Sequence, residues 1–302
     1  MNQSRADKGQ PSPPPSTTQF RHAKAHLTFS TDTKINTFIS SQRTEHPFHI
    51  TRPCVVEGDP DGMVTLYLQS SSGGVYRGDE LSMDITLDKQ AKLHLTTQAG
   101  TIVHNTQEKQ ARQSLSITLA EHSYCEYLPD PTVLFSGAAY RSDIRVTMAN
   151  TAQLMLSDSF IWHDPRYKKN SKDNSKEQPF AYYHSNIEII DEAGRTLVLD
   201  RFQLTGNVVQ TDNTAINGHY RAQGSIFLIA PLLSPEQILQ VLRETLTQFD
   251  NCYAGASTLP NNSGVIVRFL VDDGVVLQRV LQTCWIILRE QLFGETPRPR
   301  RK

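Results

Sequence analysis

One short pattern recurs three times in the middle of the chain, and it restricts the fold more than any other feature. Residues 85–95 read ITLDKQAKLHL, residues 117–127 read ITLAEHSYCEY, and residues 146–156 read VTMANTAQLML. Each copy has an aliphatic residue, Thr and another aliphatic residue, then five mostly small or polar residues, and then two mostly apolar residues flanking one other. A looser fourth copy covers residues 187–199.

The alternation of apolar and polar residues in these copies predicts β-strands, and the short polar interruption predicts a turn between two strands. One face of the first copy and its upstream extension carries Leu81, Met83, Ile85 and Leu87. Copies spaced by about 30 residues indicate stacked layers, in which each unit buries its apolar face against the next. Further strands fit residues 64–68 and 265–271. The central region is therefore predicted to be all-β and built by repetition.

Helical signals appear only late in the chain. Ser234 is suited to cap a helix, Pro235 to open it, and Gln237 follows three residues after the cap. An apolar stripe then contains Leu239, Leu242, Leu246 and Phe249. A second helix is predicted over residues 274–293, with Gly294 as its C-cap and a stripe containing Val280, Cys284, Leu288 and Leu292.

Three polar segments are predicted to lie outside the ordered core. Residues 1–20 lack the apolar centre of a secretory signal and are expected to be disordered. Residues 163–179 are lysine-rich with interspersed acids, which is typical of an exposed loop between strands. Residues 297–302 form a basic tail. Residues 21–296 then make up a single domain.

Composition excludes several classes of protein. The formal net charge is −1, so no overall field attracts nucleic acid or an anionic membrane. The longest apolar run, residues 226–233, is far shorter than the roughly 20 residues that span a bilayer. The four cysteines are widely separated, which argues against a disulfide scaffold or a zinc ribbon. We expect a cytoplasmic protein that binds neither nucleic acid nor membrane.

A glycine-rich turn precedes the first repeat strand, where residues 70–81 read SSSGGVYRGDEL. It lacks the spacing of a phosphate-binding loop, and a strand instead of a helix follows it. We predict that the glycines provide a turn with positive φ and a close backbone approach. Asp79 and Glu80 are then expected to point to opposite sides of the incoming strand.

No sequence motif indicates a catalytic centre. There is no GxSxG motif, and no histidine spacing forms a strong metal-ligand pattern. His46 and His49, for example, stand three apart in a segment that looks extended, so they are expected to face opposite sides. A triad assembled across strands stays open, because such sites are spatial. These observations favour a binding or scaffolding protein over an enzyme.

Four segments resemble the UreD family of urease accessory proteins, also called UreH. They are SGGVYRGDEL (72–81), LTTQAGT (95–101), EYLPDPTVLFSGA (126–138) and GASTLPNNSGVIVRFL (255–270), the last followed by a helix ending in LREQLFG. The resemblance runs from about residue 50 to residue 297 and keeps the order of the segments.

The resemblance implies a fold and a function. The fold is mainly β, with layered, helically wound β-sheets built from repeated hairpins and two C-terminal α-helices. The family has no known catalytic activity. It implies a urease maturation scaffold that binds UreF directly and UreG through UreF on apo-urease, and that assists nickel delivery through an internal tunnel. No cofactor is permanently bound, although nickel passes in transit.

The resemblance also suggests residues for nickel passage. In the family, the turn with Gly73, Gly74 and Gly78 and its acid form a signature at the start of a core strand. A metal in transit needs weak oxygen or imidazole ligands, because a tight site would trap it. We therefore select Asp79 and Glu80, followed by Glu126 and Asp158 and by His104. A hydrogen-bonded carboxylate in a turn is the alternative reading of each acid. No partner-binding residue is assigned, although analogy favours the C-terminal helices.

The chain departs from the family pattern at several positions. Ser72 replaces the usual proline before the paired glycines, and His104 replaces an aromatic residue. The lysine-rich loop 163–179 replaces a glycine-containing segment. The alternative function is a β-repeat protein that binds carbohydrate or cleaves glycosides, which would require exposed aromatic residues. The chain has only two tryptophans, Trp162 and Trp285.

Overall fold

The computed structural model describes residues 20–106, 108–163, 178–231 and 233–298. Nearly all of the predicted N-terminal tail, most of the lysine-rich loop and most of the basic C-terminal tail lie outside these residues.

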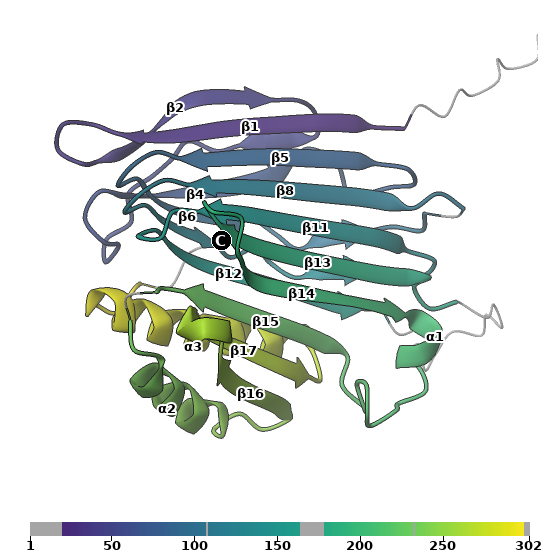
Figure 1. The fold of residues 1–302 in the computed structure, drawn as a ribbon. Helices are drawn as coiled ribbons and strands as arrows, with labels where there is room; N and C mark the ends of the chain where they lie inside the picture. The colour runs from purple at the N-terminus through teal and green to yellow at the C-terminus, as the bar shows by residue number, and fades with distance from the viewer. Residues whose placement is uncertain (1–19, 107, 164–177, 232, 299–302) are drawn as a thin grey trace, which may run out of the picture.

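Two mixed sheets face each other and make up most of the described chain (Figure 1). Sheet A has the strand order β14-β13-β11-β8-β5-β1-β2. Its strands are β1 (His22–Thr31), β2 (Thr37–Thr44), β5 (Glu80–Leu87), β8 (Ala111–Leu119), β11 (Ala139–Met148), β13 (Tyr182–Asp191) and β14 (Thr196–Thr205). Sheet B has the order β16-β17-β15-β12-β9-β6-β4-β3, with β10 beside β12 and β7 beside β10. Its strands are β3 (Phe48–Ile50), β4 (Met63–Ser70), β6 (Lys92–Thr97), β7 (Thr101–Val103), β9 (Tyr124–Tyr127), β10 (Thr132–Leu134), β12 (Gln153–Trp162), β15 (Ala222–Ile229), β16 (Cys252–Thr258) and β17 (Gly264–Val271).

The repeat predicted from the sequence builds both sheets at once. In each copy, the strand before the turn (the first arm) lies in sheet A and the strand after the turn (the second arm) lies in sheet B. Equivalent arms of successive copies therefore pair in parallel. Ile117, for example, lies beside Ile85 on one strand and Val146 on the other. The layered, mainly β class is thus confirmed.

The arms of one copy differ in one respect from hairpin arms, because they do not pair with each other. The short turn between them directs the second arm across the core to the opposite sheet, where its apolar side chains are also buried. Only the looser fourth copy forms an antiparallel hairpin within one sheet, β13 with β14, and it ends sheet A.

The apolar faces of the two sheets form the main core. Its buried members include Leu27, Leu66, Ile85, Leu93, Ile117, Leu119, Val146 and Leu154. Strand β5 confirms the predicted alternation, since Leu81, Met83, Ile85 and Leu87 are buried and the intervening side chains are not.

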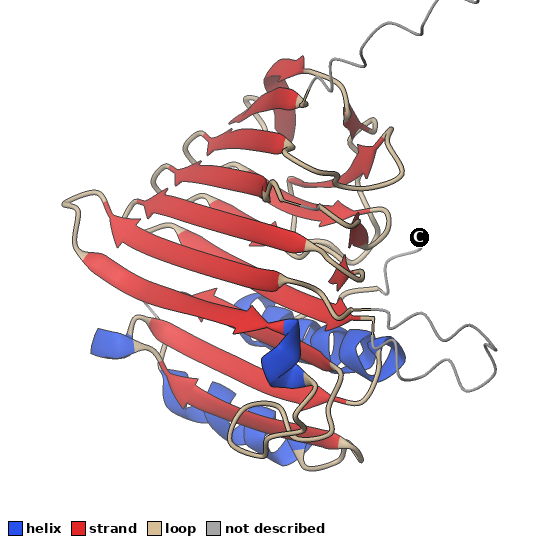
Figure 2. Ribbon diagram, turned by 90° about the vertical axis from the view of Figure 1, so that its right-hand side faces the viewer, coloured by secondary structure: helices blue, strands red, loops and turns tan. Residues whose placement is uncertain are grey.

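The late helical signals are confirmed. Helix α2 (Pro235–Leu246) and helix α3 (Gly274–Phe293) pack with β15, β16 and β17 around a second apolar core, at one end of the molecule (Figure 2). Gly294 adopts the left-handed conformation at the C-cap of α3. Ser234 stands at the N-cap of α2, but its hydroxyl donates to Glu236 instead of capping the backbone. The described helices also include α1 (Gly206–Val209) and the short 3-10 helix η2 (Pro260–Asn262). Among the described residues, no helix has both the length and the apolar character needed to cross a membrane.

Candidate functional site

The strand pairing of sheet B is interrupted in the middle of the sheet, and the break follows from the local sequence. We call this break the gap. Strand β9 ends at Tyr127 and β10 begins at Thr132, with the segment Leu128-Pro129-Asp130-Pro131 between them. The two prolines have no backbone N–H group, so the hydrogen-bond ladder cannot continue through them. The preceding repeat is interrupted at the same level, between β6 and β7. Strand β12 runs past unbroken, so its residues 157–159 border the gap.

Two threonines of the preceding repeat hold the edge of this gap. The Thr96 hydroxyl donates to the carbonyl oxygen of Leu128 at 2.6 Å. The Thr97 hydroxyl accepts from the backbone N–H of Asp130 at 2.8 Å. The segments LTTQAGT and EYLPDP, separate in the sequence, therefore meet at one place in the structure.

A cavity of about 650 Å³ lies on the inner side of the gap, between the two sheets. Polar side chains line much of it, among them Asp130, Asp158, Gln98, Gln113 and Ser142. Gly73 and Gly74 of the glycine-rich turn also line it. Buried apolar residues border the cavity as well, because Met83 and Ile144 belong to the main core and Val75 and Tyr140 to a third apolar cluster.

A second cavity of about 310 Å³ lies on the outer side of the gap, where α3 covers sheet B. Its lining includes His94 and Thr96 from β6, and Gln278, Gln282 and Trp285 from α3. Pro129, Asp130 and Ser157 line both cavities, so the two cavities lie on opposite sides of these residues at the gap. We call the two cavities and these three shared residues the passage.

Asp158 faces the inner cavity from the middle of β12. Its carboxylate accepts hydrogen bonds from the Ser185 hydroxyl at 2.6 Å and the Tyr183 hydroxyl at 3.3 Å, both on the opposite sheet. Burial raises the pKa of Asp158, and these two hydrogen bonds offset the rise only in part. The group therefore holds a proton more readily than an ordinary aspartate does, and a cation entering the cavity would compensate its charge.

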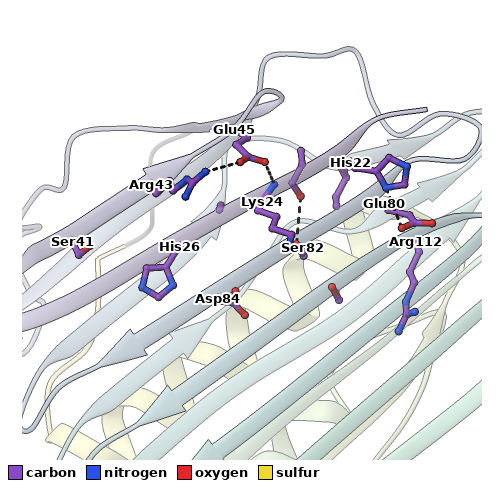
Figure 3. A pocket seen from close by; sticks show the side chains of 14 residues that line it. His22, Lys24, His26, Ser41, Arg43, Glu45, Glu80, Ser82, Asp84 and Arg112 are labelled. Carbon is purple, nitrogen blue, oxygen red and sulfur yellow. Dashed lines mark hydrogen bonds and ion pairs between the residues drawn. The ribbon is translucent and has the colours of Figure 1, made fainter. Parts of the chain in front are cut away.

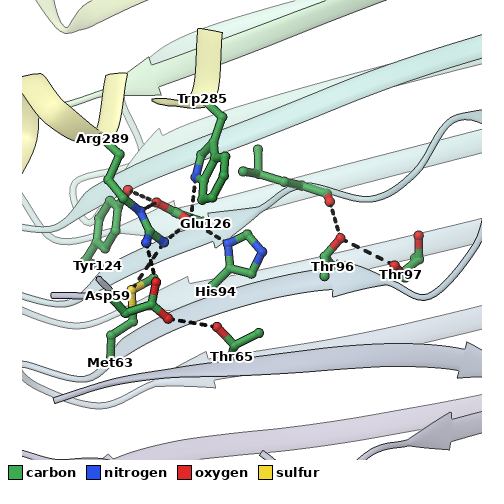
Figure 4. A network of polar contacts seen from close by, with 11 residues as sticks. Asp59, Met63, Thr65, His94, Thr96, Thr97, Tyr124, Glu126, Trp285 and Arg289 are labelled. Carbon is green, nitrogen blue, oxygen red and sulfur yellow. Dashed lines mark hydrogen bonds and ion pairs between the residues drawn. The ribbon is translucent and has the colours of Figure 1, made fainter. Parts of the chain in front are cut away.

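Glu126 lies at the centre of a buried polar network that joins sheet B to α3 (Figure 4). One carboxylate oxygen accepts from the Tyr124 hydroxyl at 2.5 Å and from Arg289 Nε at 2.8 Å. The other accepts from Trp285 Nε1 at 3.1 Å and Arg289 Nη2 at 2.6 Å, and lies 2.5 Å from His94 Nδ1.

The charges in this network determine the ionisation of Glu126. Burial by itself would raise the pKa of Glu126, but the hydrogen bonds and charges of His94 and Arg289 outweigh it and hold the pKa well below its usual range. Arg289 also bonds Asp59, whose other oxygen accepts from the Thr65 hydroxyl at 3.1 Å. The carboxylate of Glu126 thus fixes His94 and Trp285, two side chains of the outer cavity.

The glycine-rich turn behaves as the sequence predicts. Gly74 and Gly78 have positive φ angles of +141° and +71°. At Gly74 a side chain would also place its Cβ atom 2.5 Å from the carbonyl oxygen of Ile102, which is too close. Asp79 points inward, where it is 2% exposed, and Glu80 points outward. The Asp79 carboxylate pairs with Arg21 and accepts from the backbone N–H of Tyr76 at 2.7 Å. Asp79 therefore closes the turn.

Glu80 lies on the outer face of sheet A, in a shallow depression of about 870 Å³ (Figure 3). Its carboxylate is 3.1 Å from His22 Nδ1, and both side chains are more than half exposed. His104 belongs to the turn region as well, because its ring stacks on Tyr76 with centroids 4.5 Å apart and its Nε2 lies 3.0 Å from the Gly73 carbonyl oxygen.

The five side chains selected from the sequence are therefore not gathered at one point. Asp158 lines the passage, Glu126 orients residues of its outer cavity, and Asp79, Glu80 and His104 lie around the glycine-rich turn. In the part of the chain that the structure describes, no three His, Cys, Asp or Glu side chains converge as metal ligands.

Sequence reasoning did not identify Asp130, Ser157 or Arg289. One available signal was the pair of prolines inside a segment that otherwise reads as a repeat strand. Another was the charged Arg289 four residues after Trp285, on a face of α3 that is buried.

Comparison with known proteins gives a consistent result. A family model described as "UreD urease accessory protein" matches residues 21–302. The chain is 33% identical over 278 residues to "Urease accessory protein UreD 1" of Pseudomonas syringae pv. syringae (strain B728a), which covers 92% of this chain and 95% of that relative. It is 31% identical over 296 residues to a protein of the same name from Methylorubrum populi, covering 98% and 97%. "Urease accessory protein UreD" of Haloquadratum walsbyi is 27% identical over 277 residues, covering 91% and 87%.

Proposed function

Since this chain belongs to the UreD family of urease accessory proteins, with a role in urease maturation, we propose that it serves there as a non-enzymatic scaffold through which nickel moves towards apo-urease. In this proposal it binds UreF directly and UreG through UreF, in the cytoplasm. The energy of GTP hydrolysis comes from UreG, and nickel is cargo.

The passage through sheet B is the observation that carries the proposal. One of its cavities lies between the sheets and the other lies under α3, and together they present carboxylate, hydroxyl, amide and imidazole groups along their walls. Oxygen and nitrogen ligands of this kind suit divalent nickel, and groups spread along a wall hold an ion less tightly than a converging set does. Such a wall lets an ion leave as well as enter.

Of the carboxylates selected from the sequence, Asp158 is the one that lines the inner cavity. Its raised pKa means that proton and metal compete for the same group. A nickel ion that reaches the inner cavity displaces the proton and gains an oxygen ligand, and reprotonation favours its release. Asp79, Glu80 and His104 are not among the residues that line the two cavities, and their contact with nickel stays a prediction.

Narrowing the passage at the gap tests this proposal. Ser157→Leu places a larger apolar side chain in the wall that the two cavities share, whereas Ser116→Leu makes the same change at an exposed position of β8 on the outer face of sheet A. Each variant is co-expressed with UreF, UreG and apo-urease, and nickel per urease is measured by plasma mass spectrometry.

We expect Ser157→Leu to lower the nickel content of urease strongly while its complex with UreF still elutes intact from a sizing column. Ser116→Leu should load urease as the unchanged protein does. Full nickel loading by a correctly folded Ser157→Leu variant would refute transport through the passage.

The carbohydrate alternative receives no support from the tryptophans. Trp162 and Trp285 are each 4% exposed, so neither offers a face on which a sugar ring could stack.

A further inference from the structure

We propose that a row of four stacked rings on the surface of the molecule binds a proline-rich segment of this chain's own N-terminus, residues 11–15. This segment belongs to residues 1–19, which lie outside the described part of the chain. Docking of this kind is independent of nickel transport.

The four rings come from successive layers of the fold. Tyr76 stacks on His104 with ring centroids 4.5 Å apart, and Phe135 follows His104 at 5.6 Å. His163 continues the row, with its ring centroid 6.0 Å from that of Phe135. We call these four side chains the ring ladder.

The backbone fixes the spacing of the ring ladder. The N–H groups of its last three members donate in turn to the carbonyl oxygens of Val75, Val103 and Leu134, at 3.0, 3.0 and 2.9 Å. Neighbouring rings are therefore one step of parallel strand pairing apart, and they are in place before any ligand arrives. A preformed surface of this kind loses little conformational entropy on binding.

The shape of the ring ladder favours a polyproline helix. Tyr76 and Phe135 are 41% and 39% exposed, so the row is accessible. Tyr76 and His104 turn their faces to each other, with 9° between the ring planes, and Phe135 meets His104 edge to face. A sugar ring needs a free aromatic face, whereas the furrows between adjacent rings suit the prolines of an extended peptide.

The described chain begins beside the ring ladder, and this identifies the occupant. Arg21 lies over the Tyr76 ring, with its Cζ atom 5.1 Å from the ring centroid. Its Nε atom donates to the buried carboxylate of Asp79 at 2.9 Å. The N-terminal segment therefore joins the domain at the Tyr76 end of the row.

Phe20 is a second anchor at this end. Its ring lies against Gly78, where any larger residue would collide with it. Lys109 Nζ lies 3.6 Å from the centroid of the Phe20 ring, and Arg77 Cζ lies 5.8 Å from it. The glycine and the two cations hold the point from which the N-terminal segment starts.

The sequence before these anchors has the spacing that the ring ladder requires. Residues 11–19 read PSPPPSTTQ. In a polyproline II helix, with three residues per turn, Pro11 and Pro14 would lie on one side about 9 Å apart. Two steps of the ring ladder, 4.5 Å and 5.6 Å, cover a similar distance. The chain from Pro15 to Phe20 reaches at most about 18 Å, so the segment can extend over the rings.

The test measures binding of a fluorescein-labelled peptide with the sequence of residues 9–19, GQPSPPPSTTQ. One receptor is the unchanged full chain. The other is the full chain with Pro11→Ala, Pro13→Ala, Pro14→Ala and Pro15→Ala, whose own segment no longer competes. Fluorescence anisotropy gives the Kd of the peptide for each receptor.

We expect the peptide to bind the four-alanine receptor, and to bind the unchanged chain at least tenfold more weakly. A tethered segment competes at an effective concentration of about millimolar, which explains the difference. A peptide with the same four prolines replaced by alanine should bind neither receptor.

Two results of this experiment would overturn the proposal. If the peptide does not bind the four-alanine receptor, the surface does not recognise proline. If it binds both receptors with equal affinity, the rings take a proline-rich segment of a partner and the chain's own segment is not the occupant.

Variants of the four-alanine receptor locate the binding surface. Tyr76→Ser and Phe135→Ser each remove an exposed ring of the ladder, and each should weaken peptide binding by about tenfold. Phe38→Ser removes a ring of similar exposure from strand β2 and should leave the affinity unchanged. Circular dichroism shows which variants are folded. Unchanged affinity in a folded Tyr76→Ser or Phe135→Ser receptor would place the peptide elsewhere and overturn the proposal.

Discussion

Two carboxylates of similar depth show how surroundings decide the chemistry of a residue. Glu126 and Asp158 both lie on strands of sheet B, yet their pKa values move in opposite directions. Glu126 meets the guanidinium of Arg289 and the imidazole of His94, and its pKa is lowered despite burial. The pKa of Asp158 is raised by burial, and the direct partners of its carboxylate are the hydroxyls of Ser185 and Tyr183. The first acid is therefore a permanent anion in a structural network, and the second is available for exchange.

At the residue scale, Asp158 should reduce stability near neutral pH. Its folded-state pKa lies above the ordinary aspartate value of 3.8, so stability is lost as pH rises through that raised pKa. We expect Asp158→Asn to raise the thermal midpoint by a few degrees at about pH 7. The gain should shrink as pH falls towards the ordinary value of 3.8, below which both states bind the proton.

Calorimetry across this pH range checks the prediction, with Asp143→Asn as the opposite control. Ion pairs with Arg112 and Arg141 outweigh burial and lower the pKa of Asp143. Its replacement should therefore lower the midpoint at neutral pH. An Asp158→Asn variant that is less stable than the unchanged chain at every pH would contradict a raised pKa of Asp158 in the folded state.

At the element scale, helix α3 is attached to sheet B by charge as well as by apolar packing. Its stripe of Leu277, Val280, Cys284 and Leu288 packs in the second core. Arg289 follows Leu288 directly, is 1% exposed, and pairs with Glu126 and with Asp59. This pairing sets the position of α3 over the outer cavity, since Trp285 belongs to the same network.

Removal of the Arg289 charge should be costly. Arg289→Met leaves two carboxylates buried without their cation, and we expect the free energy of unfolding to fall by about 3–5 kcal/mol. The exposed change Arg279→Met on the same helix should alter it by less than about 0.5 kcal/mol. Urea denaturation measures both.

A second variant shows whether the loss comes from the stranded charge. Arg289→Met combined with Glu126→Gln should recover part of the stability, because one of the two unpaired charges is then absent. If the free energy of unfolding of the double variant lies below that of Arg289→Met by as much as an independent deletion would cost, the loss comes from packing and not from the unpaired charge.

At the scale of the whole molecule, the two ends differ. Sheet A ends at β14, whereas sheet B continues through β15, β17 and β16 and carries α2 and α3 (Figure 1). The outer surfaces of these helices expose Val241 and Val275, which are 38% and 68% accessible. The opposite end is formed by strand β2, where Phe38 is 46% accessible.

This asymmetry leads to a prediction about UreF, the partner that we propose for this chain, and about the C-terminal helices as the surface that would bind it. Val241→Glu together with Val275→Glu should weaken binding to UreF by about tenfold or more, because a charge replaces apolar contact. Phe38→Glu makes an equivalent change at the far end and should leave binding intact. Titration of the purified partners measures the affinities. If Phe38→Glu weakens binding and the helix variant does not, the surface lies at the other end.

The sequence by itself determined the elements of this protein. Alternation predicted the strands of the repeat, the Ser-Pro start and glycine end predicted α2 and α3, and the adjacent acids Asp79 and Glu80 were correctly expected to point apart. These features depend on neighbours within a few residues, so local pattern is sufficient to identify them.

Only the tertiary structure decided where the arms of each repeat go and which polar residues meet. The path of the turn across the core sends β6 and β9 to sheet B, and this brings Thr96 beside Leu128 and Thr97 beside Asp130. Likewise Glu126 and Arg289 are 163 residues apart in the chain, and they pair only because α3 covers sheet B. Contacts of this kind depend on how complete layers pack, and no local pattern in the chain encodes them.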